Sequence, residues 1–147
     1  MEKDSTANLL HILKDAGKGD IETFRREHLM KDISFPAYMD ALISLRKLKR
    51  QDIFQKADLP QKYGYKLLTG EAHTTDRDKL LRIFIAMGMT LKETQRALTL
   101  YGLAPLYAKN KRDVVIIIAL NQGISSVDTV NEWLSENGEE ELTGSAY

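Results

Sequence analysis

Apolar side chains recur three or four positions apart along most of this chain, and this spacing places them on one face of an α-helix. The stripe formed by Tyr38, Leu42, Leu45 and Leu48 predicts a helix that begins after Ser34, a residue type that often caps helices. The same spacing predicts helices over residues 49–57, 60–69, 75–87 and 90–101, and two more in the C-terminal part. The pattern therefore predicts an all-α protein, with roughly nine helices when two short N-terminal ones are included.

The first 33 residues carry the two shorter amphipathic patterns. Leu9, Ile12 and Leu13 share one helical face, and a second helix is predicted over residues 21–30 with Asp20 as its cap. We interpret residues 1–33 as an N-terminal helical extension. It can pack on the rest of the protein or pair two chains, and the sequence leaves both arrangements open.

The C-terminal part repeats a pattern that occurs earlier in the chain. Residues Arg77, Asp78, Gly88, Thr90, Glu93 and Thr94 are matched thirty-five positions later by Arg112, Asp113, Gly123, Ser125, Asp128 and Thr129. This predicts that residues 105–138 form a helix pair packed on the preceding core. Residues 114–120 are apolar nearly all round, which predicts a helix sandwiched between others rather than a strand. The acidic residues 139–147 are predicted to form a disordered tail.

Residues 48–70 contain the pattern on which the functional hypothesis depends. Ile53 and Ala57 share one face of a first helix at an i, i+4 spacing. The segment Asp58-Leu59-Pro60 then interrupts the period, because proline is tolerated at the start of a helix but not inside one. A second helix is predicted to begin at Pro60 and to end before Gly70.

Two helices of this length around a three-residue connection resemble the helix-turn-helix of the Cro and phage-repressor (Xre-type) family. The match includes the core positions Ile53, Leu59, Leu67 and Gly70, and it extends to the predicted helices on both sides. The resemblance implies a five-helix core over residues 34–104 and a function as a DNA-binding transcriptional regulator. It also implies that the helix over residues 60–69 reads the major groove.

This sequence departs from the family pattern at several positions. Phe54 stands where the family usually has a small alanine, and Gly64 where it usually has a large aliphatic residue. We interpret these two as a compensating exchange that keeps the volume of the core. Asp58 replaces the turn glycine and Pro60 replaces the usual Ser or Thr cap, which leaves the geometry of the turn open. The basic run that often follows the second helix is replaced by residues 71–74, Glu-Ala-His-Thr.

The helical period assigns DNA contacts to individual residues. Four side chains of the second helix point away from its apolar face and are predicted to lie in the groove: Gln61, Lys62, Tyr65 and Lys66. Gln61 can pair with an adenine edge and Lys62 with guanine. The start of the first helix is predicted to clamp a phosphate through Lys49, Arg50 and Gln51. The opposite strand is assigned to Thr69, Thr74 and Arg77. Double-stranded DNA is therefore the predicted partner.

The charges are unevenly distributed, although the formal net charge of the 147 residues is +0. Between Arg46 and Arg82, ten Lys or Arg residues stand against five acidic ones, a local charge of +5. From Asp113 onward there are seven acidic residues and no Lys or Arg. Phosphate neutralisation supplies much of the affinity of DNA-binding proteins, so the basic part suits the helix-turn-helix. A set of solvated helix faces would give the same count.

The remaining composition narrows the classes of function. Without cysteine the chain has no disulfide, no thiolate metal site and no cysteine nucleophile. His11, His28 and His73 share no metal-ligand spacing with one another or with nearby carboxylates. We therefore expect no enzymatic activity, no cofactor and no bound metal. The longest apolar run, residues 114–120, is too short to span a bilayer and the N-terminus lacks a signal-peptide pattern, so we expect a cytoplasmic protein.

A protein-interaction module that keeps the helix-turn-helix shape without binding DNA is the alternative hypothesis. The zero net charge, Glu71 and the acidic C-terminal part favour it. The two hypotheses differ in whether the positive surface over the predicted contact residues is continuous or is crossed by Asp58 and Glu71.

The resemblance also implies a homodimer, because a single recognition helix touches few base pairs and most relatives of this type bind DNA as two-fold dimers. Trp133 and Leu134 lie close in sequence to the apolar residues 114–120 and could anchor the contact. Trp133 could equally close the core of a single chain.

Overall fold

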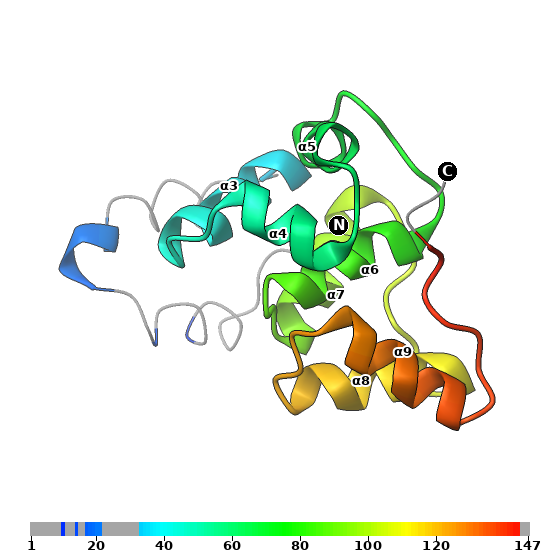
Figure 1. Ribbon diagram of the computed structural model, residues 1–147. Coiled ribbons are helices and arrows are strands. Elements are labelled where there is room, and N and C mark those ends of the chain that lie inside the picture. Colours follow the sequence, from blue (N-terminus) through cyan, green and yellow to red (C-terminus); the bar gives the residue numbers. More distant parts are fainter. Residues whose placement is uncertain (1–9, 11–13, 15–16, 22–32, 145–147) are drawn as a thin grey trace. The chain divides into compact units, whose positions relative to one another are not determined.

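The computed structural model describes residues 10, 14, 17–21 and 33–144 (Figure 1). The described residues are helical and contain no strand, which confirms the all-α prediction. A short 3-10 helix, η1, covers Lys18–Asp20, and the α-helices are α3 (Phe35–Leu45), α4 (Arg50–Ala57), α5 (Gln61–Thr69), α6 (Arg77–Ala86), α7 (Leu91–Tyr101), α8 (Lys111–Asn121) and α9 (Val127–Glu136). The two predicted N-terminal helices lie almost entirely outside the described residues.

The chain divides into two compact units, residues 1–48 and residues 49–147. The core predicted over residues 34–104 extends across this division. In the first unit, Ser34 caps α3 as predicted, because its hydroxyl accepts a hydrogen bond from the backbone N–H of Ala37 at 3.2 Å. The apolar side chains of α3, among them Tyr38, Met39 and Leu42, are buried.

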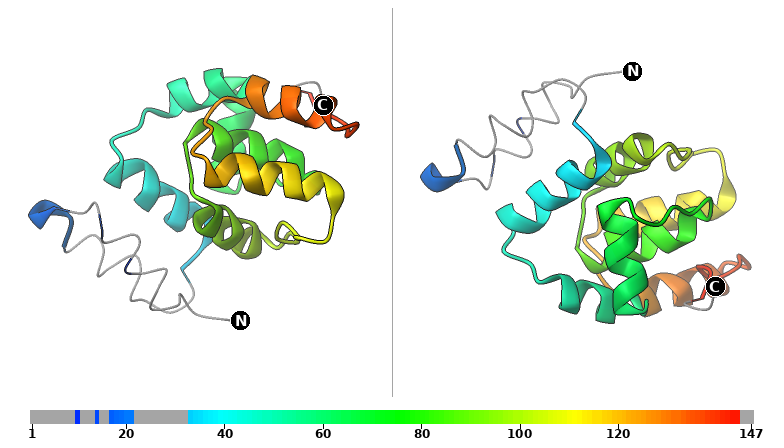
Figure 2. Two further views of the ribbon diagram at one scale, coloured as in Figure 1. Left: turned by 90° about the horizontal axis from the view of Figure 1, so that it is seen from below. Right: turned by 90° about the horizontal axis from the view of Figure 1, so that it is seen from above.

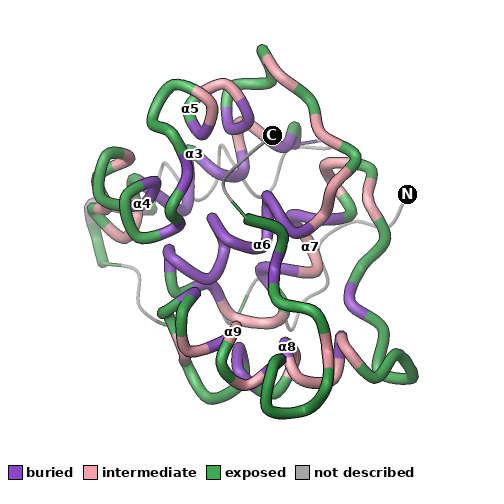
Figure 3. Tube along the Cα trace, turned by 45° about the vertical axis from the view of Figure 1, so that its right-hand side comes forward, coloured by how far each residue is buried: buried purple, intermediate pink, exposed green. Residues whose placement is uncertain are grey.

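The second unit is built around α6. Every residue of this helix from Asp78 to Ala86 is buried, and α6 packs against α4, α7 and α9 (Figure 3). The sequence predicted instead that the apolar segment 114–120 would be the sandwiched helix, and this is wrong: Ile118 of α8 is 46% exposed. Composition misled the prediction because α6 carries Lys79 and Arg82, whose charged groups are bound inside the fold.

The repeated helix pairs are visible as α6–α7 and α8–α9, and α8 and α9 lie side by side (Figures 1 and 2). Gly88 and Gly123 end the first helix of each pair with positive φ angles of +69° and +75°, a conformation that favours glycine. Thr90 caps α7 through a capping box with Glu93. Ser125 matches Thr90 in the repeat, but the cap of α9 is Ser126, whose hydroxyl accepts a hydrogen bond from the N–H of Thr129 at 3.2 Å.

The two Arg-Asp dipeptides of the repeat pair with each other across the helix starts. The Arg77 guanidinium lies 2.6 Å from a carboxylate oxygen of Asp113, and the Arg112 guanidinium lies 2.8 Å from one of Asp78. The repeat seen in the sequence therefore corresponds to a reciprocal contact in space, which joins the N-termini of α6 and α8.

Residues 139–144 follow α9 and form an extended C-terminal strap. The sequence predicted a disordered tail here. Within residues 139–144, however, the strap lies against the rest of the second unit, and Leu142 is 3% exposed. Arg82 donates to the carbonyls of Leu142 and Thr143, and Lys79 donates to that of Gly144. These backbone acceptors cannot be recognised in the sequence, where the segment is marked only by its three glutamates.

Candidate nucleic-acid interface

The connection between α4 and α5 has the three residues that the sequence predicted, Asp58, Leu59 and Pro60. Asp58 adopts the left-handed conformation, with φ 55° and ψ 49°, and its N–H donates to the carbonyl of Gln55 at 3.1 Å. Leu59 is buried, and Pro60 is the N-cap of α5. The chain thus turns with an aspartate in a conformation that glycine adopts at less steric cost.

Phe54 and Gly64 hold α5 close to α4. A Cβ atom on Gly64 would lie 2.5 Å from Cδ1 of Phe54 and 2.8 Å from Cε1, which is closer than real side chains approach. Both residues are buried. The predicted contact between Phe54 and Gly64 is therefore present, with the large residue on α4 and the small one on α5.

The exposed face of α5 carries the residues assigned to the groove. Gln61, Lys62 and Tyr65 are exposed, Tyr65 with 51% of its surface, and Lys66 is half-buried. Nε2 of Gln61 donates to the carbonyl of Gln51 at 2.9 Å, which joins the first turns of α4 and α5. Orphan backbone N–H groups at helix starts attract anions, so two such starts next to exposed cations suit a phosphate.

The predicted phosphate clamp at the start of α4 keeps its position on the surface. Lys49 is the N-cap residue of α4 and is exposed, as is Gln51, whereas Arg50 is half-buried. The Gln61 hydrogen bond therefore brings this clamp next to the N-terminal end of α5. The structure brings together six of the predicted contact residues in this way: Lys49, Arg50, Gln51, Gln61, Lys62 and Tyr65.

The three residues assigned to the opposite DNA strand also make contacts within the chain. Thr69 donates from its hydroxyl to the carbonyl of Lys66 at 3.3 Å. The Thr74 hydroxyl accepts from the N–H of Asp76 at 3.0 Å. Arg77 binds Asp113 and also donates to the carbonyls of Ala104 and Pro105. Sequence periodicity could not reveal the partners of Arg77, because they lie 27 to 36 positions away along the chain.

The loop after α5 is held by Tyr101, the last residue of α7. Its hydroxyl accepts a hydrogen bond from the N–H of Thr74 at 2.9 Å, and its ring stacks on that of His73 with centroids 4.6 Å apart. Burial raises the pKa of the Tyr101 hydroxyl, and the hydrogen bond from Thr74 opposes this only in part. Tyr101 is therefore a neutral anchor for the segment that leaves the candidate recognition helix.

The positive charge of residues 46–82 is smaller at the surface than in the sequence. Arg77, Lys79 and Arg82 are bound by acceptors within the fold. Residues 49–71 contain five Lys or Arg and three acidic residues, so five minus three leaves a charge of +2. Asp52, Asp58 and Glu71 are all exposed. The candidate interface thus combines cations at the starts of α4 and α5 with two exposed carboxylates, Asp52 in the first turn of α4 and Asp58 in the connection to α5.

Asp78 of α6 binds both Arg112 of α8 and Thr143 of the C-terminal strap. Burial by itself would raise the pKa of its carboxyl, but the hydrogen bonds from Arg112 and Thr143 outweigh burial and hold the pKa below its ordinary value of 3.8. The same pairing raises the pKa of the Arg112 guanidinium, since its hydrogen bond with Asp78 outweighs burial. The N–H and hydroxyl of Thr143 donate to Asp78 at 3.0 and 3.1 Å. The pair therefore stays ionised near neutral pH.

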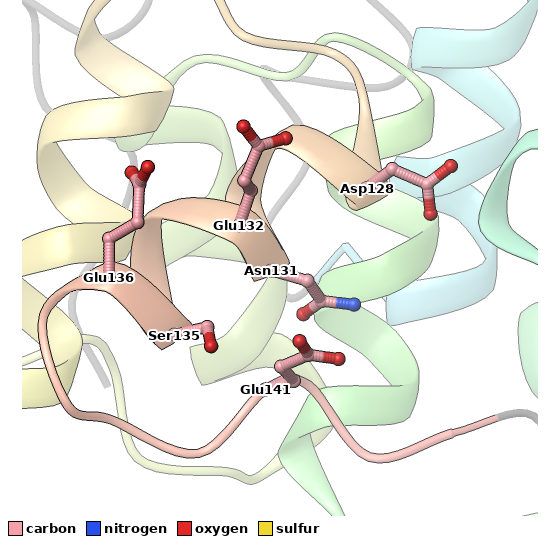
Figure 4. Close-up of a pocket in the computed structure, with 6 residues that line it drawn as sticks. All are labelled: Asp128, Asn131, Glu132, Ser135, Glu136 and Glu141. Atoms are coloured by element: carbon pink, nitrogen blue, oxygen red, sulfur yellow. The ribbon is translucent and has the colours of Figure 1, made fainter.

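Four carboxylates gather on the opposite end of the second unit. Figure 4 shows Asp128, Glu132 and Glu136 on α9 and Glu141 on the strap, around a groove of about 330 Å³ that Asn131 and Ser135 also line. Among the described residues, no three His, Asp or Glu side chains are arranged to hold a metal ion. Such a surface repels phosphate, so nucleic acid is not expected to bind along α9.

Comparison with known proteins adds no relative: no protein-family model, no curated protein and no solved structure matches this chain. The resemblance to the Xre-type family therefore stays a prediction. In the part of the chain that the structure describes, none of the helices has the length and apolar character needed to cross a membrane.

Proposed function

We propose that this protein is a cytoplasmic DNA-binding transcriptional regulator that reads the major groove with α5, and that it is not an enzyme. The observation that supports this most is the hydrogen bond from Gln61 to the carbonyl of Gln51, which fixes the starts of α4 and α5 side by side. With this arrangement, one contiguous surface offers both backbone N–H groups for phosphate and exposed side chains for base edges.

The roles within this surface follow from residue chemistry. Lys49 and the first turn of α4 bind a backbone phosphate, and Lys62 contacts guanine or the adjacent phosphate. Gln61 presents its amide to an adenine edge, while its Nε2 group is oriented by Gln51. Tyr65 lies one turn further along α5 and packs against base or sugar. Thr74 and Arg77 are not included, because their polar groups are engaged inside the fold.

Selection of bound sites from a random pool of DNA duplexes tests the proposal. A binder of this kind should enrich a common sequence, and its affinity should fall with salt at a log–log slope of about −0.9 per phosphate neutralised. Roughly three to six phosphate contacts per chain would give a steep fall. Failure to enrich any site, or an affinity that does not change with salt, would contradict the proposal.

A matched pair of lysine variants separates a specific surface from general positive charge. Lys62→Ala removes an exposed cation from α5, and Lys92→Ala removes one from α7. Both change the net charge equally. We expect Lys62→Ala to weaken DNA binding by about tenfold or more and Lys92→Ala to have little effect. Equal losses would indicate nonspecific attraction.

A protein-interaction module is the second candidate function, and one observation favours it. Three of the ten cations that suggested DNA binding, Arg77, Lys79 and Arg82, are bound within the chain, and Asp52 and Asp58 are exposed next to the candidate interface. Under this hypothesis the exposed face of α5, with Tyr65, would bind a protein surface. The duplex selection would then enrich nothing, while Tyr65→Ala would weaken binding to the protein partner.

A further inference from the structure

The internal repeat pairs α6 with α8, but the two helices differ in how much of their apolar surface is covered. With the offset of thirty-five residues, Leu80 and Ile83 of α6 correspond to Val115 and Ile118 of α8. Leu80 and Ile83 are fully buried, whereas Val115 is only partly buried and Ile118 is 46% exposed. Positions that the fold covers completely on α6 are therefore only partly covered or exposed on α8.

The uncovered positions lie on one face of α8. We define the α8 stripe as Lys111, Val114, Val115, Ile118 and Gln122, which follow one another at intervals of three or four residues except for the adjacent valines. The opposite face, with Ile116, Ala119 and Leu120, is buried in the second unit. Exposed apolar patches rimmed by polar residues mark interaction sites, and this stripe is apolar in its middle and polar at both ends.

We infer that the α8 stripe is a self-association surface, through which two copies of this chain pair their α8 helices in antiparallel orientation about a two-fold axis. In an isologous contact the same patch serves on both copies, so each residue of the stripe meets a residue of the same stripe. Ile118 of one copy then packs against Val114 of the other, close to the axis. Each copy thereby covers the apolar residues that the other exposes.

The distribution of charge favours a second copy as the occupant. Lys109 and Lys111 are exposed at the N-terminal end of α8, and no Lys or Arg follows Arg112. Beyond the C-terminal end of α8 come Asp128 and Glu132, both exposed. Antiparallel pairing places the lysines of each copy at the C-terminal end of the partner's α8, where the helix dipole is negative. Parallel pairing would instead bring the lysines of both copies together.

The size of the stripe limits the strength of this contact. Stable interfaces bury about 1,200 Å² or more, and one pair of short helices buries less than that. We therefore expect association in the micromolar range or weaker. The inference does not depend on the proposed DNA binding, because the contact forms between free chains and is measured without DNA. If the self-association test fails, the proposed DNA binding still stands, and if the DNA-binding test fails, the proposed self-association still stands.

Sedimentation equilibrium of the full chain without DNA tests the inference. As the concentration rises through the micromolar range, the mean mass should increase from that of one chain toward that of two. A mass that stays at one chain up to about 500 μM overturns the proposal, even if another protein covers α8. Association beyond two chains overturns it as well, because an isologous contact closes at the dimer.

Two variants locate the contact. Ile118→Lys places a charge in the middle of the stripe at an exposed position, so the fold should persist by circular dichroism, and the dissociation constant should rise at least about tenfold. Ser135→Lys adds the same charge at an exposed position of α9 and should associate like the wild type. The proposal fails if Ile118→Lys associates as well as the wild type, or if Ser135→Lys is weakened to the same extent.

A third variant tests the orientation of the two helices. Lys111→Glu places a negative charge against the negative end of the partner's α8, so an antiparallel pair should associate about threefold or more weakly at low salt. Association that is unchanged or tighter in Lys111→Glu overturns the antiparallel arrangement.

Discussion

Phe54 occupies the space that a side chain at position 64 would need: its Cδ1 atom lies 2.5 Å from where a Cβ on Gly64 would stand. The ring comes from α4 and the glycine from the middle of α5, so this contact sets the distance between the two helices. A helix interior rarely favours glycine, which is less stable there than alanine by about 1 kcal/mol. Here the close approach of Phe54 explains why a larger residue is absent.

We expect Gly64→Leu to destabilise the protein by about 1–3 kcal/mol or more, because the added side chain overlaps the ring of Phe54. Phe54→Ala alone should cost about 3–5 kcal/mol through the cavity that it leaves. The double variant places the large residue on α5 and the small one on α4, so its loss should be smaller than the sum of the two single losses by more than about 1 kcal/mol. Urea denaturation of the four proteins measures this coupling, and additive losses would show that the two sites do not share one space.

The left-handed conformation of Asp58 gives a second prediction. Residues other than glycine are strained there by about 1–2 kcal/mol, although aspartate tolerates it better than most. Asp58→Gly should therefore be more stable than Asp58→Ala by about 1 kcal/mol. Because both variants lose the same carboxylate, their difference reports the backbone alone. Thermal unfolding that ranks alanine above glycine would mean that the turn changes its conformation in the variants.

The C-terminal strap is expected to stabilise the second unit. A chain that ends at Gly138 loses the buried Leu142, worth about 2 kcal/mol, and loses the strap carbonyls that accept hydrogen bonds from Lys79 and Arg82. We expect a loss of at least about 3 kcal/mol in urea denaturation. A chain that ends at Gly144 keeps the whole strap and serves as the control, with the stability of the full chain.

Stability should depend on the ionisation of Asp78 in acid. Because the folded pKa lies below the ordinary value of 3.8, its contribution is fully present above that value and is lost as the pH falls through the folded pKa. Asp78→Asn cannot ionise, so the stability difference between wild type and variant should be constant from pH 7 to about 5 and shrink below about 4. Urea denaturation at each pH gives the two curves. Curves that stay parallel down to about pH 3 would mean that protonation of the Asp78 carboxylate does not weaken its contribution to stability.

The proposed interface contains two kinds of DNA contact: Lys49 binds a phosphate and positions the protein, whereas Gln61 contacts a base. Lys49→Ala should weaken binding to the selected site and to an unrelated duplex by similar factors, because it removes a phosphate contact. Gln61→Ala should lose about 1–3 kcal/mol at the selected site and little at the unrelated one. Titrations of both duplexes at one salt concentration compare the two variants. Equal losses for Gln61→Ala at both duplexes would show that it reads no base.

Within residues 33–144, the sequence by itself determined which segments form helices and several of the helix ends. Ser34 and Gly70 act through neighbours within four positions, so local chemistry was enough to predict them. The repeat was also readable, because Arg77 and Arg112 each precede an aspartate at the start of a helix. The exposed face of α5 followed from helical periodicity alone.

The tertiary structure alone decided which helix is central and which cations are free. Composition pointed to residues 114–120 as the sandwiched helix, yet α6 is buried with Lys79 and Arg82 because the strap returns some sixty positions later to accept their hydrogen bonds. The same holds for Arg77, whose acceptor is Asp113. A buried charge depends on partners that are distant in sequence, whereas periodicity reports only neighbours on one helix. That is why the stripe left exposed on α8 could be found only in the folded chain.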